Sequence, residues 1–367
     1  MYQRLGHIIL FTCLIAAGRA QEQQIRFLQP GDTIYKSIDQ LPQEILPALQ
    51  AETGFWDFSS LLAPYVHEVY VRPVANGRAG RLRSDLVMLD ADGVERFAAV
   101  SESGMSLTGF RIPLTDNVTT TGVCDPPIPL RSTALRPTEA TMTGTCTFSI
   151  PQRAHASFGL TDQWAADSLR LRVEYAMSVE TDGSGALLLP GGQYGVYRER
   201  REIQSQVIVE HFRNGRWRPA DARVTMALPY ELQNGTIYTF WSPSIAEPVA
   251  VVHMDPGGEV KRVDFKATPY GGRLITNFPK VPDVFVYPNP SFGEVRFDFV
   301  NLRPGQYTLE IYSILGVKQR SLGPLFVDGN RTVPMDLSDL KKGTYIYRLV
   351  DQNQNAVRSK RLVIITP

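Results

Sequence analysis

The side chains best suited to chemistry in this sequence are its histidines, because imidazole serves both as a general base and as a zinc ligand. Four of the five histidines lie outside the N-terminal segment: His67, His155, His211 and His253. None of them occurs in the HExxH or HxH spacing that places two imidazoles on one metal. His67 and Glu68 are neighbours on a predicted strand, where adjacent side chains point to opposite faces. The sequence therefore predicts no zinc site.

A serine nucleophile or a nucleotide cofactor would require glycine patterns that the chain lacks. Gly104-Met105-Ser106 continues into Leu107 without the second glycine of a GxSxG elbow. Neither a phosphate-binding loop ending in Lys nor the GxGxxG fingerprint of dinucleotide-binding proteins occurs. We therefore expect no catalytic residue of these classes, no cofactor, and no ATP or NAD chemistry.

Paired carboxylates are the next chemistry to consider, since two acids that face one sugar bond can hydrolyse it. The 37 Asp and Glu residues are spread along the chain, and no pair stands out. Asp90, Asp92 and Glu95 resemble part of a calcium loop, but Asp92-Gly93 is fully explained as a hairpin turn and a third ligand before Gly93 is missing. We expect a turn and no metal here. A secreted hydrolase of polysaccharide or peptide stays the alternative function.

Aromatic side chains would bind carbohydrate if they projected from one sheet face, because a π face stacks on a pyranose ring. The candidates are Trp217, Trp241, Tyr194, Tyr197 and Tyr238. Residues 237–241 alternate between two faces of a predicted strand, and at least one of these faces must be buried. Core packing is the favoured interpretation, and a carbohydrate or other surface ligand is the alternative.

The N-terminal segment is typical of a secretory signal peptide. Arg4 precedes the apolar run Ile8–Ala17, and Gly18-Arg19-Ala20 supplies the small residues of a cleavage site before Gln21. The run is too short to span a bilayer and is followed at once by polar residues. Cys13, which has no lipidation context, leaves with this peptide.

Two cysteines remain in the exported chain, Cys124 and Cys146, separated by 146 − 124 = 22 positions. An isolated pair in an oxidising compartment is most simply a disulfide. The alternative is a catalytic thiol or a metal pair, but neither cysteine lies in CxxC spacing or beside a histidine. We therefore predict a Cys124–Cys146 disulfide.

Length and composition favour two β-rich units. The chain has 367 residues, 29 Gly and 26 Pro, with abundant Val, Thr and Tyr, which is typical of many short strands joined by tight turns. It has 43% hydrophobic and 20% charged residues and a formal net charge of +1, so nothing indicates a nucleic-acid partner.

Alternation of apolar and polar residues predicts a meander of antiparallel strands after residue 65. The strands are expected at Val66–Val71, Asp85–Asp90, Val94–Val100, Thr145–Ile150, Leu169–Val179, Gly195–Phe212, Ala222–Leu232, Thr236–Trp241, Val249–Met254 and Val260–Ala267. Asp92-Gly93 and Asn234-Gly235 are typical of hairpin turns. Helical signal is weak, with one short surface helix expected over Asp39–Leu49.

A second unit is predicted after a linker at residues 280–283. Its expected strands are Val295–Val300, Tyr307–Tyr312, Val317–Leu322, Thr332–Met335, Thr344–Val350 and Val357–Ile365. A unit of this length is able to bury a core of its own. We therefore place the boundary between residues 281 and 282.

Three segments of this second unit carry a family resemblance. They read VYPNPSFGEVRFDF, GQYTLEIYSILGVKQRS and LSDLKKGTYIYRLVDQNQNAVRSKRLVI. In this order they resemble the C-terminal sorting domain (type A) of proteins exported by the type IX, or Por, secretion system. On that motif, the residues expected to carry the sorting signal are Tyr287, Pro288, Asn289, Pro290, Gly316, Gly343, Lys360 and Arg361.

The resemblance implies an immunoglobulin-like β-sandwich that is recognised by the type IX translocon at the outer membrane. In the family the domain is usually removed, and the passenger is then released or attached to surface lipopolysaccharide. The chain is accordingly expected to use a Sec signal peptide, to pass through the periplasm and the outer membrane, and to end secreted or on the cell surface.

The expected architecture is all-β: a large antiparallel β-sandwich-like passenger at residues 21–281, followed by the small sandwich at 282–367. Residues 53–61, 182–192 and 238–243 look like segments of uncharacterised exported proteins that carry this sorting domain, and these relatives have no activity to carry over. The leading hypothesis is a non-enzymatic cell-surface or extracellular protein that acts in ligand binding, adhesion or envelope structure.

Overall fold

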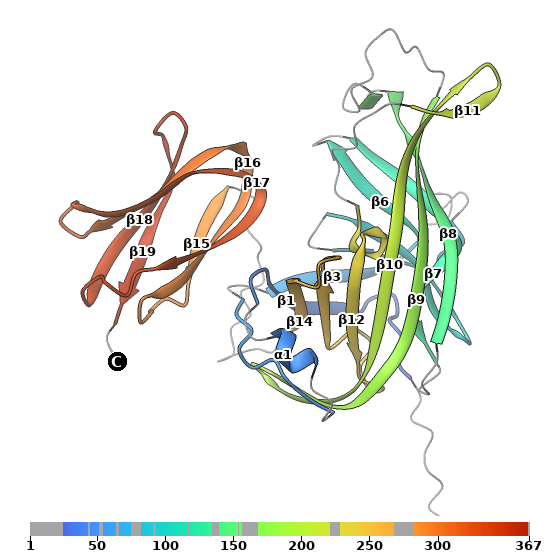
Figure 1. Cartoon of the computed structure of the whole chain (residues 1–367), viewed down its shortest axis with the longest axis horizontal. Coiled ribbons are helices and arrows are strands. Elements are labelled where there is room, and N and C mark those ends of the chain that lie inside the picture. Colours follow the sequence, from blue (N-terminus) through green and yellow to red (C-terminus); the bar gives the residue numbers. More distant parts are fainter. Residues whose placement is uncertain are drawn as a thin grey trace, which may run out of the picture.

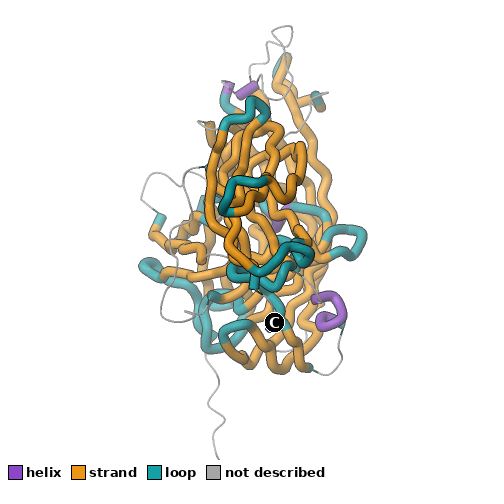
Figure 2. Tube along the Cα trace, turned by 90° about the vertical axis from the view of Figure 1, so that its left-hand side faces the viewer, coloured by secondary structure: helices purple, strands orange, loops and turns teal. Residues whose placement is uncertain are grey.

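The structure is a computed structural model and is nearly all β (Figure 2). It describes residues 25–42, 45–50, 54–63, 66–74, 82–90, 93–115, 118–133, 139–152, 154–155, 168–220, 228–267 and 282–365. The strands form two separate sheets, one for the body and one for the tail, and these make up two lobes (Figure 1). The predicted signal peptide and residues 280 and 281 of the predicted linker lie outside the described residues, so the boundary between the units stays a prediction.

A single sheet of 14 strands makes up the body. Its strands are β1 (Thr33–Asp39), β2 (Phe55–Asp57), β3 (Val66–Pro73), β4 (Leu86–Leu89), β5 (Glu95–Ser101), β6 (Gly104–Thr115), β7 (Val118–Ser132), β8 (Glu139–Ile150), β9 (Ser168–Leu189), β10 (Gly192–Arg213), β11 (Arg216–Pro219), β12 (Gly235–Trp241), β13 (Ala250–Met254) and β14 (Val260–Lys266). The body also contains the short helix α1 (Ile45–Leu49) and the 3₁₀ turn η2 (Tyr230–Leu232).

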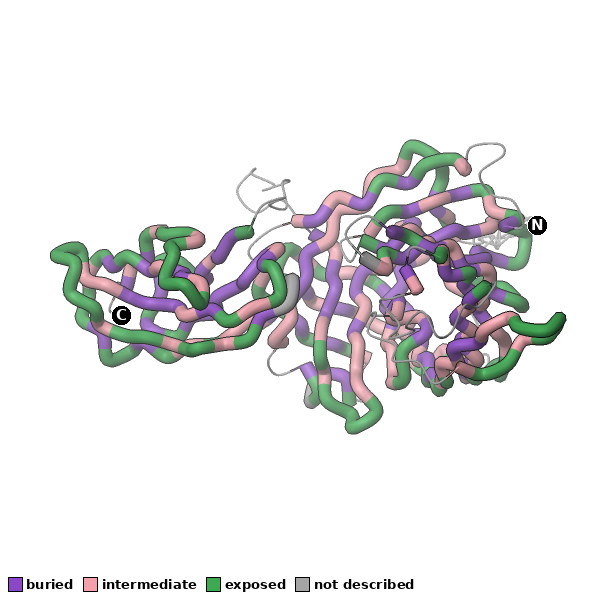
Figure 3. The backbone as a smooth tube through the Cα atoms, turned by 90° about the horizontal axis from the view of Figure 1, so that it is seen from above, coloured by how far each residue is buried: buried purple, intermediate pink, exposed green. Residues whose placement is uncertain are grey.

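The sheet of the body closes into a barrel-like ring. The strand order runs from β11 and β10 through β12, β13, β14, β1, β3, β4, β5, β6, β7 and β8 to β9 and β2, and β9 also pairs with β10. The β9–β10 hairpin pairs over its whole length, from Leu189 opposite Gly192 to Ser168 opposite Phe212. Figure 3 shows the strands of the body arranged around an interior. All neighbouring pairs are antiparallel except β2 with β9, so the predicted all-β, antiparallel class is confirmed.

Apolar side chains pack on both faces of this ring. The larger cluster includes Leu28, Val69, Met88 and Met105, and these residues also line a cavity within the ring, so this cluster lies inside. A second cluster brings α1 and β2 against the outer face of β12 and β13 through Ile45, Leu49, Trp56, Phe58 and Phe240. Both faces of β12 are therefore buried, as alternation along a covered strand requires.

The predicted disulfide is present in the body. Cys124 on β7 lies opposite Cys146 on β8, and the two cysteines are bonded. Both side chains are buried in the inner cluster. The bond therefore joins two adjacent strands of the ring.

The tail forms a smaller, curled five-stranded sheet with its own core. Its strands are β15 (Asp283–Tyr287), β16 (Glu294–Ser313), β17 (Lys318–Asp336), β18 (Gly343–Asp351) and β19 (Ala356–Ile364). The core cluster, which includes Phe297, Leu309, Tyr347 and Leu362, takes all its described members from residues 284–364.

Several predicted elements differ from the structure. The helix expected over Asp39–Leu49 is wrong at its start, because Asp39 ends β1; of the described residues in this range, Ile45–Leu49 are helical. This helix lies on the outside of the ring, with Ile45 and Leu49 buried in the outer cluster and Leu46 exposed. The strand expected over Ala222–Leu232 is wrong at its end, because Tyr230–Leu232 form the 3₁₀ turn η2 after Pro229, while residues 221–227 lie outside the described part.

Other differences are omissions or splits. The prediction missed five strands of the body, β1, β2, β6, β7 and β11. In the tail, four predicted strands merge pairwise into the long, bent β16 and β17.

Gly185 allows β2 to approach β9 closely, and a substitution at this position can test the contact. A Cβ atom on Gly185 would lie 1.7 Å from the backbone oxygen of Gly54. Gly185→Ala is therefore expected to lower the free energy of unfolding by at least about 2 kcal/mol, because the backbone must shift. Urea unfolding measures this change.

The matched control is Gly195→Ala on the neighbouring strand. A Cβ atom at Gly195 meets nothing within 4 Å, so its effect should stay within about 0.5 kcal/mol. Equal stabilities of the two variants would contradict the close approach of β2.

Candidate functional site

The interior of the ring contains a cavity with mostly apolar walls. Its volume is about 150 Å³. Strands that are far apart in the sequence line the cavity. Among them are β1, β3, β12, β13 and β14, which are neighbours in the ring. Closed β-sheets that enclose small ligands have this arrangement, with a few polar groups among apolar side chains.

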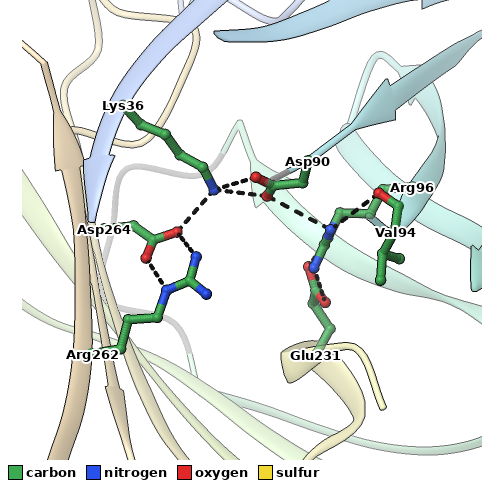
Figure 4. A network of polar contacts seen from close by, with 7 residues as sticks. All are labelled: Lys36, Asp90, Val94, Arg96, Glu231, Arg262 and Asp264. Carbon is green, nitrogen blue, oxygen red and sulfur yellow. Dashed lines mark hydrogen bonds and ion pairs between the residues drawn. The ribbon is translucent and has the colours of Figure 1, made fainter. Parts of the chain in front are cut away.

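A chain of charged side chains crosses one wall of the cavity (Figure 4). The ammonium nitrogen of Lys36 lies 2.6 Å from an Asp90 oxygen and 2.9 Å from an Asp264 oxygen. Arg262 donates to Asp264 at 2.8 Å. At the other end, a guanidinium nitrogen of Arg96 lies 3.6 Å from Asp90.

Arg96 extends this chain to the 3₁₀ turn η2. It forms a two-point ion pair with Glu231, with nitrogen–oxygen distances of 2.7 and 3.2 Å. Arg96 and Arg262 also lie over the ring of Tyr230, at 5.2 and 4.6 Å from its centroid. We call Lys36, Asp90, Arg96, Glu231, Arg262 and Asp264 the charge network.

Mutual attraction holds the members of the charge network in their charged forms. Burial alone would raise the pKa of Asp90, but the ammonium of Lys36 and the guanidinium of Arg96 outweigh it and lower the pKa to about 2. Burial opposes the charge on Asp264 too, yet Arg262 and Lys36 hold its pKa well below the ordinary value. Burial disfavours the ammonium of Lys36, but Asp264 and Asp90 raise its pKa.

Two histidines beside the network are kept neutral. Burial lowers the pKa of His67 to about 4, with a further contribution from the positive charge of Lys36. Burial likewise lowers the pKa of His253 to about 4, despite the nearby carboxylate of Asp264. The ring of His253 packs on Tyr230 with centroids 4.5 Å apart.

This arrangement is poorly suited to acid-catalysed hydrolysis. Asp90 and Asp264 do bring two carboxylates close together, since both contact the nitrogen of Lys36. However, a glycosidase needs one carboxylic acid that keeps its proton near neutral pH. Lowered pKa values on both groups favour two permanent anions, each held by a cation.

The five aromatic residues singled out from the sequence do not share one face. Trp241 lines the cavity and is 1% exposed, whereas Tyr238 and Tyr194 pack in the outer cluster. Tyr197 is buried, and Trp217 packs on Phe212 and under Arg170 near β11. Core packing, the favoured interpretation, accounts for most of this group.

Of the five aromatic candidates, Trp241 lines the cavity. Its indole N–H is buried and has no hydrogen-bond partner among the described residues. The guanidinium of Arg131 covers the ring at 4.6 Å from the centroid, and Arg131 itself donates to the backbone oxygens of Arg26, Ser242, Ile245 and Ala246. An unsatisfied buried donor is costly and is a natural partner for a ligand acceptor.

Sequence reasoning identified only some of these positions. Asp90 was singled out as a metal ligand or turn residue, but it contacts Lys36 and Arg96; Glu95, from the same candidate loop, pairs with Arg111. Asp92 lies outside the described residues. Within the described part of the chain, no group of three or more His, Cys, Asp or Glu side chains is placed to hold a metal ion.

In the tail, the Tyr287-Pro288-Asn289-Pro290 segment is fastened to the last strand. The Asn289 amide donates to the backbone oxygen of Arg361 at 2.8 Å and accepts from the Val363 N–H at 2.9 Å. The Tyr287 hydroxyl donates to Asp298 at 3.3 Å. The opening of the tail is therefore packed against both β19 and β16.

The remaining sorting candidates occupy different environments. Gly316 lies at the tip of the β16–β17 hairpin with φ +80°, where glycine is favoured, and Gly343 begins β18. Lys360 is held by Asp283 at 2.8 Å and covers the ring of Phe285, whereas Arg361 is exposed.

One buried ion pair joins the tail to the body. Arg296 on β16 donates to Asp39 at the end of β1 with a nitrogen–oxygen distance of 2.7 Å, and the side chain of Asp39 is 0% exposed. Asp39 also accepts from the backbone N–H groups of Leu41 and Leu62. The tail therefore covers a fixed carboxylate of the body.

Comparison with protein families identifies the tail. Residues 285–365 match the model of the secretion system C-terminal sorting domain. This part of the chain is a sorting domain. The sorting domain supports assignment of the chain as cargo of type IX secretion, and it implies export to the cell surface or the extracellular space. Residues 25–267 lie outside the match.

Other comparisons add little about the body. No curated protein matches the chain. One similar solved structure is dimeric latent PorU from Porphyromonas gingivalis, with 12% identity and a TM-score of 0.22 over 92% of this chain. The chain spans 30% of that protein, and the likeness is too weak to support any assignment. Among the described residues, no helix is long and apolar enough to cross a membrane.

The neutral histidines predict a pH dependence of stability. His253 has a pKa of about 4 in the fold against 6.5 in a model compound, so the unfolded chain binds more protons between these values. Stability is therefore full above pH 6.5 and falls as the pH drops toward 4, by about 1.4 kcal/mol per pH unit for each such histidine. Urea unfolding across this pH range should show the slope.

His253→Gln is expected to remove the contribution of His253 to the pH dependence of the free energy of unfolding, since glutamine does not titrate. The matched control is His155→Gln, which changes a histidine outside the charge network. A slope for His253→Gln equal to that of the unsubstituted protein would contradict the burial of a neutral His253.

Proposed function

We propose that the chain is type IX cargo whose body is a non-enzymatic binding protein for a small, mostly apolar molecule that carries a hydrogen-bond acceptor. The observation that carries this proposal is the mostly apolar cavity inside the ring, which is lined by Trp241, a side chain whose buried indole N–H has no hydrogen-bond partner among the described residues. Apolar walls with a few fixed polar groups are typical of ligand pockets. A ligand acceptor at this N–H would satisfy the donor.

The charge network supports binding over hydrolysis. The cations and anions of the network are paired with one another, so they fix the shape of the wall without leaving a proton donor for catalysis. Breaking one partner of such a buried pair is costly, which keeps each side chain in place. A rigid wall is an advantage for binding, because little ordering remains to be done when a ligand enters.

For export, we propose that the chain follows the route of its tail. The predicted signal peptide directs it to the periplasm, and the translocon then recognises the tail through Tyr287, Pro288, Asn289, Pro290, Gly316, Gly343, Lys360 and Arg361. Release from the cell and attachment to lipopolysaccharide are two possible ends of this route.

A ligand pair tests the binding proposal. The probes are 2-octanone, which carries a carbonyl acceptor, and octane, which lacks one. Trp241→Phe keeps the aromatic ring and removes the N–H, so affinity for 2-octanone should fall about five- to tenfold while affinity for octane stays unchanged. Isothermal titration of the full chain measures both.

Trp217→Phe is the matched control, because Trp217 lies on β11 and does not line the cavity. Absence of 2-octanone binding to the unsubstituted protein, or equal affinities for the Trp241→Phe and Trp217→Phe variants, would refute this binding role.

Deletion of residues 282–367 tests the export proposal. The truncated body is expected to accumulate in the periplasm, because it lacks the segment that the translocon reads. Fractionation of cells and culture medium followed by immunoblotting locates it. A Cys124→Ala/Cys146→Ala variant with an intact tail serves as the control for a weakened body, and normal release of the truncated chain would overturn the assignment.

A further inference from the structure

The charged side chains that line the cavity are all matched by an opposite charge. Five of them belong to the charge network, whose cations and anions pair with one another. The other two are Arg201, which pairs with Glu199 at 2.6 Å, and Lys266, which pairs with Glu247. A charged ligand would therefore enter without a partner for its charge, and an unpaired ion inside a protein is costly. The cavity accordingly favours an uncharged molecule.

His253 is a second lining residue with an unsatisfied buried polar atom. Its Nδ1 is buried and, like the indole N–H of Trp241, has no hydrogen-bond partner among the described residues. The ring is neutral near pH 7, because burial lowers the pKa of His253 to about 4. In a neutral imidazole, Nδ1 is either the donor or the acceptor. A hydroxyl both donates and accepts, so it pairs with Nδ1 in either case.

Strand register separates these two polar atoms along the wall of the cavity. Ile237 and Trp241 lie on the same face of β12, four residues apart, and Ile237 is opposite His253 on β13. The Cα atoms of Ile237 and Trp241 are therefore about 13 Å apart. Val251, which is opposite Thr239, lines the cavity between them. The wall thus has a polar atom toward each end and an apolar side chain in the middle.

We propose that the ligand is an uncharged chain with a polar group at each end, a carbonyl at Trp241 and a hydroxyl at His253, and that His253 is the residue that selects the hydroxyl. The inference rests on the proposed binding function and adds the second polar group and its partner. A molecule with one polar group would leave Nδ1 unsatisfied, whereas a carboxylate at the same end would bring an unmatched charge into the cavity.

A series of ketones tests the ligand class by isothermal titration of the full chain. 8-Hydroxy-2-octanone adds a terminal hydroxyl to 2-octanone and should bind about five- to tenfold more tightly. 7-Oxooctanoate carries a carboxylate in place of this hydroxyl and should bind at least about tenfold more weakly than 8-hydroxy-2-octanone. 4-Hydroxy-2-butanone is too short to reach both residues, so its hydroxyl should give no advantage over 2-butanone.

Variants of His253 test the residue. The measured quantity is the ratio of the affinities for 8-hydroxy-2-octanone and 2-octanone. His253→Phe keeps a flat ring without Nδ1, so this ratio should fall to about one, whereas His253→Asn keeps a donor and an acceptor and should retain most of the gain. The matched control is His211→Phe on β10, since His211 does not line the cavity. Urea unfolding of each variant checks that the body remains folded.

The outcomes distinguish this inference from the function on which it rests. Binding of 2-octanone to the unsubstituted protein without a gain from the hydroxyl overturns the inference and leaves the proposed function in place. Absence of binding by both 2-octanone and 8-hydroxy-2-octanone overturns both. A gain from the hydroxyl that is equal in the His253→Phe and His211→Phe variants also overturns the inference, because another residue would then bind the hydroxyl.

Discussion

Pairing of β9 with β10 closes the sheet of the body, and the other features of the interior depend on this closure. Without it, β9 and β10 would each leave an edge of the sheet open to solvent. With it, inward side chains of β1, β12 and β14 line a common cavity. The length of the hairpin explains how it performs this role, since each strand has 22 residues and spans several neighbours in turn.

Closure of the ring determines the environment of the charged residues on its inward face. Lys36, Asp264 and Arg262 would be ordinary surface groups on an open sheet, where ion pairs contribute little. Inside the ring they are largely removed from water, so each needs an opposite charge nearby. The attraction between Lys36 and Asp90 lowers the pKa of Asp90 and raises the pKa of Lys36. Removing one partner of such a network would leave an uncompensated buried charge, so its members depend on one another.

The same argument explains which parts were predictable from sequence. In the tail, strict alternation and turn glycines such as Gly316 predicted the strands, and the motif predicted the domain. In the body, β14 has Arg262, Asp264 and Lys266 on one face, which is typical of a solvent-exposed face. Only the closure of the ring, a contact between segments distant in sequence, turns that face inward. The charge network was therefore missed as a site, although its individual residues are plain in the sequence.

One part of the tail surface contacts the body, and another part, at the hairpin tip, is exposed. Arg296 lies against the body through Asp39, and Thr332, which is opposite Asp298 in the sheet, reaches Gln40 at 3.1 Å. Tyr287, from the predicted sorting motif, is buried close to this junction. The hairpin tip at Leu315 stays exposed while the tail is docked. The hairpin tip is therefore accessible to a partner of the intact chain, whereas a partner that reads the Tyr287 side chain has to uncover it first.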